Sequence, residues 1–99
     1  MEIEFADASL ALIETDDAAK TKLPIAVIKA ARRKLTLLRA VPDDRSLRNW
    51  KSLHYEKLKG DREGQRSIRV NNSYRIVFLL DSDTEPQIAT ILSVEDYHK

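Results

Sequence analysis

The hydrophobic period of the chain changes near Pro42, and this change limits it to a fold that joins helices to a sheet. Between Pro24 and Ala40 apolar residues recur every three or four positions, as on one helix face, namely at Ile28, Ala31, Leu35 and Leu38. Later segments are alternating or continuously apolar, which predicts strands over residues 67–70, 74–80 and 87–94. A helical front followed by consecutive strands predicts an α+β domain.

Weaker signals complete this outline. Residues 2–5 alternate and predict a short first strand, and Asp7 or Ser9 is expected to cap a short helix that ends near Glu14. Gly60 and Gly64 predict a turn between two strands. We therefore expect two N-terminal helices packed on a small, mostly antiparallel sheet. The 99 residues are expected to form a single domain, residues 1–99, with one core.

Composition excludes several classes of protein. The chain has no cysteine, which removes disulfides, thiolate catalysis and cysteine metal sites. No apolar run reaches the roughly 20 residues that cross a bilayer, and acidic residues follow Met1 where a signal peptide carries cations. We expect a cytoplasmic protein without a membrane partner.

Charge is segregated along the chain although the formal net charge is only +1. Residues 45–75 carry nine Lys or Arg against three Asp or Glu, and both ends of the chain are acidic. The basic middle indicates either a surface that binds a polyanion or a solvated face whose charges pair with their neighbours. Charge alone does not choose between these two interpretations.

The last residues hold side chains that can move protons. Cleaving RNA without a metal needs a base for the 2′-OH proton, an acid for the leaving 5′ oxygen, and cations that stabilise the transition state. Tyr97 and His98 supply a phenol and an imidazole. Residues of a regular strand alternate in direction, so both enter one site only if the tail bends after Val94. The alternative is that His98 is an exposed, inert side chain.

Cations for a phosphate lie on the predicted strands. Ile68 and Val70 are expected to face the core, which turns Arg69 to the opposite face, where Arg75 of the next strand would join it. Lys57 and Lys59 are expected nearby, and guanidinium groups bind phosphate through paired hydrogen bonds. In the alternative interpretation, Arg75 merely pairs with an acid such as Asp96.

Metal and nucleotide sites are not indicated. His54 and His98 are 44 positions apart, which is not the spacing of metal ligands, and Gly60-x-x-x-Gly64 lacks the following Lys-Ser/Thr of a nucleotide loop. No cofactor is expected. Leu47, Trp50 and Leu53 are interpreted as apolar residues that fix an irregular or edge segment. Trp50 is most simply a core residue, and the alternative is an exposed tryptophan that stacks on a base.

Four ordered segments resemble the HigB-type toxins of the RelE/ParE superfamily of toxin–antitoxin modules. They are Lys57-Leu58-Lys59-Gly60-Asp61-Arg62-Glu63-Gly64, Ser67-Ile68-Arg69-Val70, Tyr74-Arg75-Ile76-Val77-Phe78 and Val94-Glu95-Asp96-Tyr97-His98. The resemblance covers about the last half of the chain. It implies a RelE-like fold, similar to microbial ribonucleases, and a toxin that cuts mRNA in the ribosomal A site without a metal.

The resemblance also implies partners and residue roles. The partners would be the 70S ribosome with its mRNA and a cognate helix-turn-helix antitoxin similar to HigA. The family's catalytic lysine and terminal triplet match Lys59, Asp96, Tyr97 and His98. Phosphate contacts are expected from Lys57, Arg66, Arg69 and Arg75.

One departure from the family pattern concerns a histidine. Family members often carry a histidine three residues before the motif lysine, but Glu56 has that spacing here and His54 lies two residues further upstream. His54 is equivalent only if an insertion or bulge restores the spacing. Two other functions stay open: a ParE-like poison of a topoisomerase, and a small RNA- or protein-binding module without toxicity.

Overall fold

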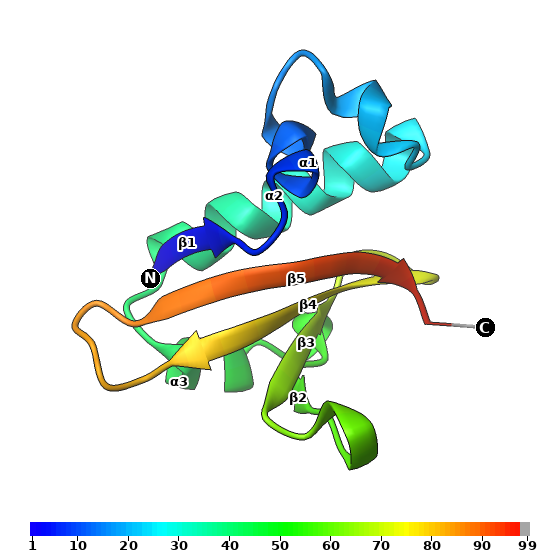
Figure 1. Cartoon of the computed structure of the whole chain (residues 1–99). Coiled ribbons are helices and arrows are strands. Elements are labelled where there is room, and N and C mark those ends of the chain that lie inside the picture. The colour runs from blue at the N-terminus through cyan, green and yellow to red at the C-terminus, as the bar shows by residue number, and fades with distance from the viewer. Residues whose placement is uncertain (98–99) are drawn as a thin grey trace.

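The protein is described by a computed structural model that covers residues 1–97. Five strands form one sheet in the order β1-β5-β4-β3-β2, shown in Figure 1. The strands are β1 (Glu2–Phe5), β2 (Glu56–Lys57), β3 (Gln65–Arg69), β4 (Tyr74–Asp81) and β5 (Ile88–Asp96). β1 runs parallel to β5, and the other three pairings are antiparallel. The fold is α+β with a mixed sheet, and its antiparallel part agrees with the sequence prediction.

The long helix α2 (Ile25–Ala40) forms where the helical period predicts it. Its apolar stripe of Ile28, Ala31, Leu35 and Leu38 is buried in the core. The first predicted helix is shorter than expected, because α1 (Ala8–Ala11) passes into a 3-10 turn over Leu12–Glu14. The Asp7 side chain caps α1 by accepting a hydrogen bond from the backbone N–H of Ser9 at 2.9 Å.

Two cations of α2 hold this N-terminal segment in place. Arg32 donates to the backbone carbonyls of Ile13 and Thr15 at 2.6 and 2.8 Å, and Arg39 donates to the Glu14 carboxylate. Figure 1 shows α1 lying against α2 on one side of the sheet. These two arginines therefore have structural contacts, whereas Arg33 on the same helix is exposed.

The segment after α2 differs from the prediction of an irregular stretch. Asp43 caps a short helix, α3 (Asp44–Arg48), and a 3-10 turn, η3, follows over Lys51–Leu53. Leu47 and Leu53 are fully buried, but Trp50 keeps 48% of its exposure. The interpretation of Trp50 as a core residue was therefore wrong, and Leu47 and Leu53 anchor this segment in the core.

The core lies on one face of the sheet. Arg66, Ile68, Ile76 and Phe78 share this face, because Arg66 is in register with Phe78 and Ile68 with Ile76. Side chains from α2 and α3 join Ile68, Ile76 and Phe78 in one apolar cluster. α3 is tied to the same face, since Arg66 donates to Asp44 and to the Tyr55 hydroxyl at 3.0 and 2.6 Å. The opposite face carries Ser67, Arg69 and Arg75 together with the fully buried Val77, and its polar side chains form the candidate site.

Candidate active site

The candidate site lies on the sheet face that the helices leave open. Ser67, Arg69 and Arg75 share this face, because Ser67 pairs with Val77 and Arg69 with Arg75. Arg75 also pairs across β5 with Glu95, which adds a carboxylate to the same face. The prediction that Arg69 and Arg75 meet away from the core is confirmed by this register.

A hollow on this face brings together some of the polar groups that the sequence singled out. We call it the central hollow, and it is lined by His54, Glu56, Ser67, Arg69, Arg75 and Tyr97. It combines two guanidinium groups with a carboxylate, an imidazole and a phenol. His54 reaches it from the end of η3, where it adopts a left-handed backbone conformation with φ of 47°. Glu56 reaches it from β2, in register with Ser67.

Contacts with residues 69–73 help to hold Tyr97 in the central hollow. Its backbone N–H donates to the Ser73 carbonyl at 3.0 Å, and its hydroxyl donates to the Asn72 carbonyl at 2.9 Å. The guanidinium carbon of Arg69 lies 5.7 Å from the centre of its ring, within the range of a cation–π interaction. The tail does not bend after Val94, because β5 continues to Asp96 and alternation returns Tyr97 to the open face.

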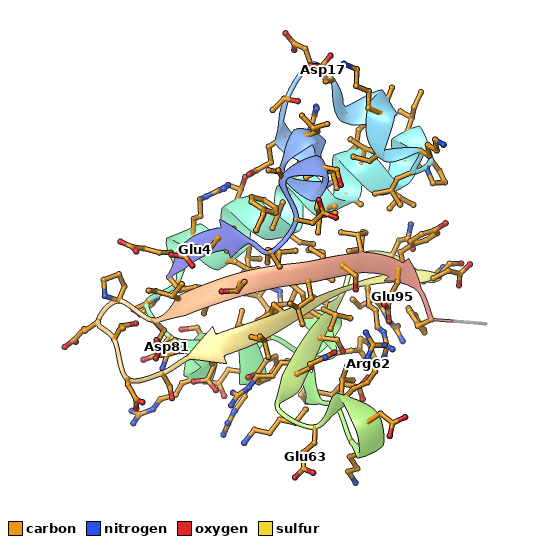
Figure 2. The ribbon with its side chains drawn as sticks, in the orientation of Figure 1. Glu4, Asp17, Arg62, Glu63, Asp81 and Glu95 are labelled. Carbon is orange, nitrogen blue, oxygen red and sulfur yellow. The ribbon has the colours of Figure 1, made fainter. Side chains whose placement is uncertain are left out.

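A tight ion cluster borders the central hollow, formed by Arg62, Arg75, Glu95 and Ser93. Arg62 comes from the 3-10 turn η4 (Gly60–Arg62) and donates to both carboxylate oxygens of Glu95, at 2.6 and 3.1 Å. Arg75 donates to one of them from Nε and Nη2, at 3.2 and 3.0 Å, and the Ser93 hydroxyl donates to the other at 2.9 Å. Figure 2 shows Arg62 reaching from the turn toward Glu95 near the end of β5.

This cluster changes the acidity of Glu95. The hydrogen bonds from Arg62 lower the pKa of the Glu95 carboxyl from 4.5 to about 2, with further help from Ser93 and Arg75 and against the effect of partial burial. The carboxylate therefore stays ionised at neutral pH and does not exchange protons there. The acid that pairs with Arg75 is Glu95 and not Asp96, which lies one residue further along the strand.

The remaining predicted residues lie elsewhere. A second hollow, the turn hollow, is lined by Lys57, Leu58, Lys59, Gly60, Glu63, Gly64, Gln65 and Arg66. Lys57 and Arg66 are in register with each other and share the sheet face opposite Arg75. Asp96 pairs with Tyr74, also away from Arg75, and His98 lies outside the described residues. The predicted set is thus divided between two hollows, and Lys59 does not line the one that holds Arg75 and Tyr97.

Glu56 and Glu95 are the two acidic residues of the site that were not predicted from the sequence. Glu56 lines the central hollow at the spacing where the family pattern has a histidine, and this spacing was the signal that could have identified it. Glu95 was overlooked because a one-residue change of register exchanges it with Asp96. Within residues 1–97 no group of three or more His, Asp or Glu side chains is placed to hold a metal ion.

Solved structures of similar fold are bacterial toxins. A YoeB/ParE toxin from Agrobacterium tumefaciens aligns over 98% of this chain and 99% of its own, with a TM-score of 0.63 and 15% identity. The E. coli YafQ mutant H87Q aligns over 98% and 93%, with a TM-score of 0.61 and 13% identity. A YoeB–YefM complex from Staphylococcus aureus aligns over 100% and 98%, with a TM-score of 0.57 and 20% identity. The chain therefore has a fold similar to that of the YoeB-type toxins.

Sequence comparison identifies the family within this class. The family described as HigB-like toxin, the RelE-like toxin of the type II toxin–antitoxin system HigB, matches residues 3–97. Toxin HigB-1 of Vibrio cholerae serotype O1 is 36% identical over 78 residues, which are 79% of this chain and 82% of that protein. The chain belongs to the HigB-like toxin family of the RelE superfamily. No helix within residues 1–97 is long and apolar enough to cross a membrane.

Proposed function

We propose that this HigB-like toxin is a cytoplasmic endoribonuclease that cuts mRNA on the translating ribosome without a metal ion. The observation that carries the proposal is the central hollow, where Arg69, Arg75, Glu56 and Tyr97 meet. This set contains the cations that bind a phosphate and a carboxylate that accepts a proton, as RNA cleavage requires. Ribosome dependence is what the resemblance to the HigB-type toxins implies.

In the proposed reaction the 2′ oxygen of one nucleotide attacks the neighbouring phosphorus. Glu56 takes the 2′-OH proton, the O2′–P bond forms, and the P–O5′ bond breaks as its oxygen receives a proton. The products are a 2′,3′-cyclic phosphate and a 5′-hydroxyl. His54 lines the central hollow and supplies that proton, because an imidazole gives and takes protons near neutral pH. The family resemblance assigns His98 to the same step.

The cations and the aromatic ring have separate roles. Arg75 and Arg69 bind the phosphate oxygens and stabilise the charge that builds up on them as phosphorus gains its fifth bond. The Tyr97 hydroxyl donates a hydrogen bond to the Asn72 carbonyl, which fixes the position of the ring. A nucleotide packs against this ring. Lys57, Lys59 and Arg66 line the turn hollow, where they contact backbone phosphates beyond the scissile one.

The partners follow from the family. The chain belongs to a family of type II toxins, and a toxin of the same fold has been solved as a YoeB–YefM complex. We infer that a cognate antitoxin binds this chain and blocks the central hollow, and that it carries a helix-turn-helix domain like HigA. Coexpression with a HigA-like cognate antitoxin should restore growth and allow the two proteins to be purified together.

The test is 5′-end mapping of cellular mRNA after brief induction of the toxin. Arg75→Ala and Tyr97→Ala should remove most codon-phased cuts while the proteins stay folded by circular dichroism. Lys29→Ala removes an exposed cation of α2, far from the hollow in the sequence and on the other face of the sheet, and should cut like the wild type. Full cleavage by both site variants would refute the proposed site.

The same cultures test the topoisomerase alternative. A DNA-damage response with intact mRNA after induction would assign the chain to a ParE-like activity and overturn the nuclease proposal. The metal-independent part is tested in a purified translation extract. A chelator removes the divalent ions, and they are then added back only to the level that the ribosome needs. Cleavage should continue under these conditions.

A further inference from the structure

Glu95 uses different edges of the two guanidinium groups that it contacts. Arg62 uses all three of its guanidinium nitrogens within the protein, with Nη1 and Nη2 donating to Glu95 and Nε to the Gln65 side-chain oxygen at 3.1 Å. Arg75 donates to Glu95 from only one edge of its guanidinium group, the edge formed by Nε and Nη2. Among the hydrogen bonds within residues 1–97, none uses Nη1 of Arg75, and Arg75 lines the central hollow.

Glu95 is itself fixed from three directions. It stands directly across from Arg75 in the β4–β5 register, and Ser93 and Arg62 bind its second oxygen. Among the described residues, the backbone of β5 at Glu95 pairs with β4 alone, because β1 pairs with β5 only over residues 88–91. A carboxylate held this firmly defines the plane and direction of the guanidinium group that it binds.

We propose that Glu95 is a positioning residue that orients Arg75, so that the remaining guanidinium edge faces the scissile phosphate, and that Arg62 holds Glu95 in place. This inference rests on the proposed nuclease function and adds a role to it. Arg62 also links Glu95 to the turn hollow. It belongs to η4, and residues on both sides of Arg62 in the sequence line that hollow. The Glu95 carboxylate thereby connects the turn that follows Lys59 to the end of β5 next to Tyr97.

Two other roles for Glu95 predict different kinetics. A carboxylate that competes with the substrate for Arg75 would lower activity, so its removal would raise kcat/KM. The ionisation of a carboxylate that transfers protons would appear in the pH–rate profile. Glu95 stays ionised throughout the neutral range, so no such ionisation is expected there. A positioning residue acts in the transition state, so its loss lowers kcat without raising KM.

The kinetic test uses a programmed ribosome with one cleavable codon and the variants Glu95→Gln, Arg75→Ala and their combination. We expect Glu95→Gln to lower kcat by about tenfold or more with KM unchanged or smaller, and to have no further effect in the Arg75→Ala background. Glu4→Gln is the matched control, because it removes the same charge from β1, at the opposite side of the molecule in Figure 2. A raised kcat/KM, or a full additional loss in the Arg75→Ala background, would overturn the inference.

A second measurement keeps the inference separate from the nuclease proposal. Nuclear magnetic resonance of protein labelled with nitrogen-15 arginine follows the Nε–H proton of Arg75, which should exchange slowly in the wild type and at least about tenfold faster in Glu95→Gln. Arg62→Gln keeps Glu95 but removes its hydrogen bonds from Arg62. This variant should accelerate exchange of the Arg75 Nε–H proton less than Glu95→Gln does. A wild-type toxin that does not cut mRNA counts against the proposed function, whereas an Arg75 proton that exchanges equally in all three proteins counts against the positioning role.

Discussion

Replacing Glu95 by Gln should destabilise the protein at neutral pH and have little effect in strong acid. The folded protein lowers the pKa of this carboxyl from 4.5 to about 2, chiefly through the hydrogen bonds from Arg62. Because the folded-state pKa lies below the unfolded one, the ionised carboxylate stabilises the native state above about pH 4.5. This stabilisation is lost progressively as the pH falls from 4.5 toward 2.

The size of the effect is bounded by the same pKa. A fall from 4.5 to about 2 corresponds to at most about 3.4 kcal/mol, at roughly 1.36 kcal/mol per pH unit. The Glu95 side chain keeps 30% of its exposure, and its partners Arg62 and Arg75 keep 37% and 21%, so water screens part of the interaction. We therefore expect Glu95→Gln to lower the free energy of unfolding by about 1–2 kcal/mol at pH 7.

The assay is urea unfolding of wild type, Glu95→Gln and the control Glu4→Gln at a series of pH values. The difference between wild type and Glu95→Gln should shrink from about 1–2 kcal/mol at pH 7 to a few tenths near pH 2.5. Glu4→Gln should match the wild type throughout, since the exposed Glu4 forms no ion pair within residues 1–97. A difference that is the same at pH 7 and at pH 2.5 would refute the reasoning, because it would show that charge plays no part.

Three further substitutions test the fold, each by urea unfolding at pH 7. Phe78→Ala should cost about 3–5 kcal/mol, because Phe78 is fully buried and stacks on Tyr55 with ring centres 6.3 Å apart; a cost below about 1 kcal/mol would contradict the core assignment. Trp50→Ala should cost less than about 1 kcal/mol, because the side chain keeps 48% of its exposure; a cost like that of Phe78→Ala would show that Trp50 is buried. Gly64→Ala should cost about 1–2 kcal/mol although space is open around it, because φ of 92° disfavours a side chain; an unchanged midpoint would mean that the turn relaxes without penalty.

The sequence predicted those features that depend on local period. The stripe of α2 and the alternation of Ile68 and Val70 with Arg69 identify buried faces directly, since side-chain direction follows from spacing within one element. The family resemblance likewise rests on ordered local segments, and the match over residues 3–97 confirms it. Each of these inferences needs only one element at a time.

The composition of the site depended on information that no single element contains. Lys59 and Arg75 were expected in one cationic hollow, but the pairing of Lys57 with Arg66 turns that part of the hairpin to the opposite face. The choice between Glu95 and Asp96 as the partner of Arg75 required the register of β4 on β5, which a shift of one residue reverses. Trp50 was misplaced for a similar reason, because only the packed structure shows that Leu47 and Leu53, and not Trp50, anchor this segment in the core.

The sheet order explains how residues near the end of the described chain can take part in a site. The ends of a chain are usually frayed unless they are tied down. β5 is the last strand of the sheet in sequence order; β1 pairs with its first part, residues 88–91, and β4 pairs with it as far as Asp96. Figure 1 shows β5 crossing the middle of the molecule, with α1 and α2 above it and α3 below it. Opening the strand at Glu95 would break backbone hydrogen bonds to β4 and the ion cluster together, so Tyr97 is held by the most connected strand of the fold. A proton-transfer site that needs side chains fixed to within a fraction of an ångström can therefore be built next to this end of the chain.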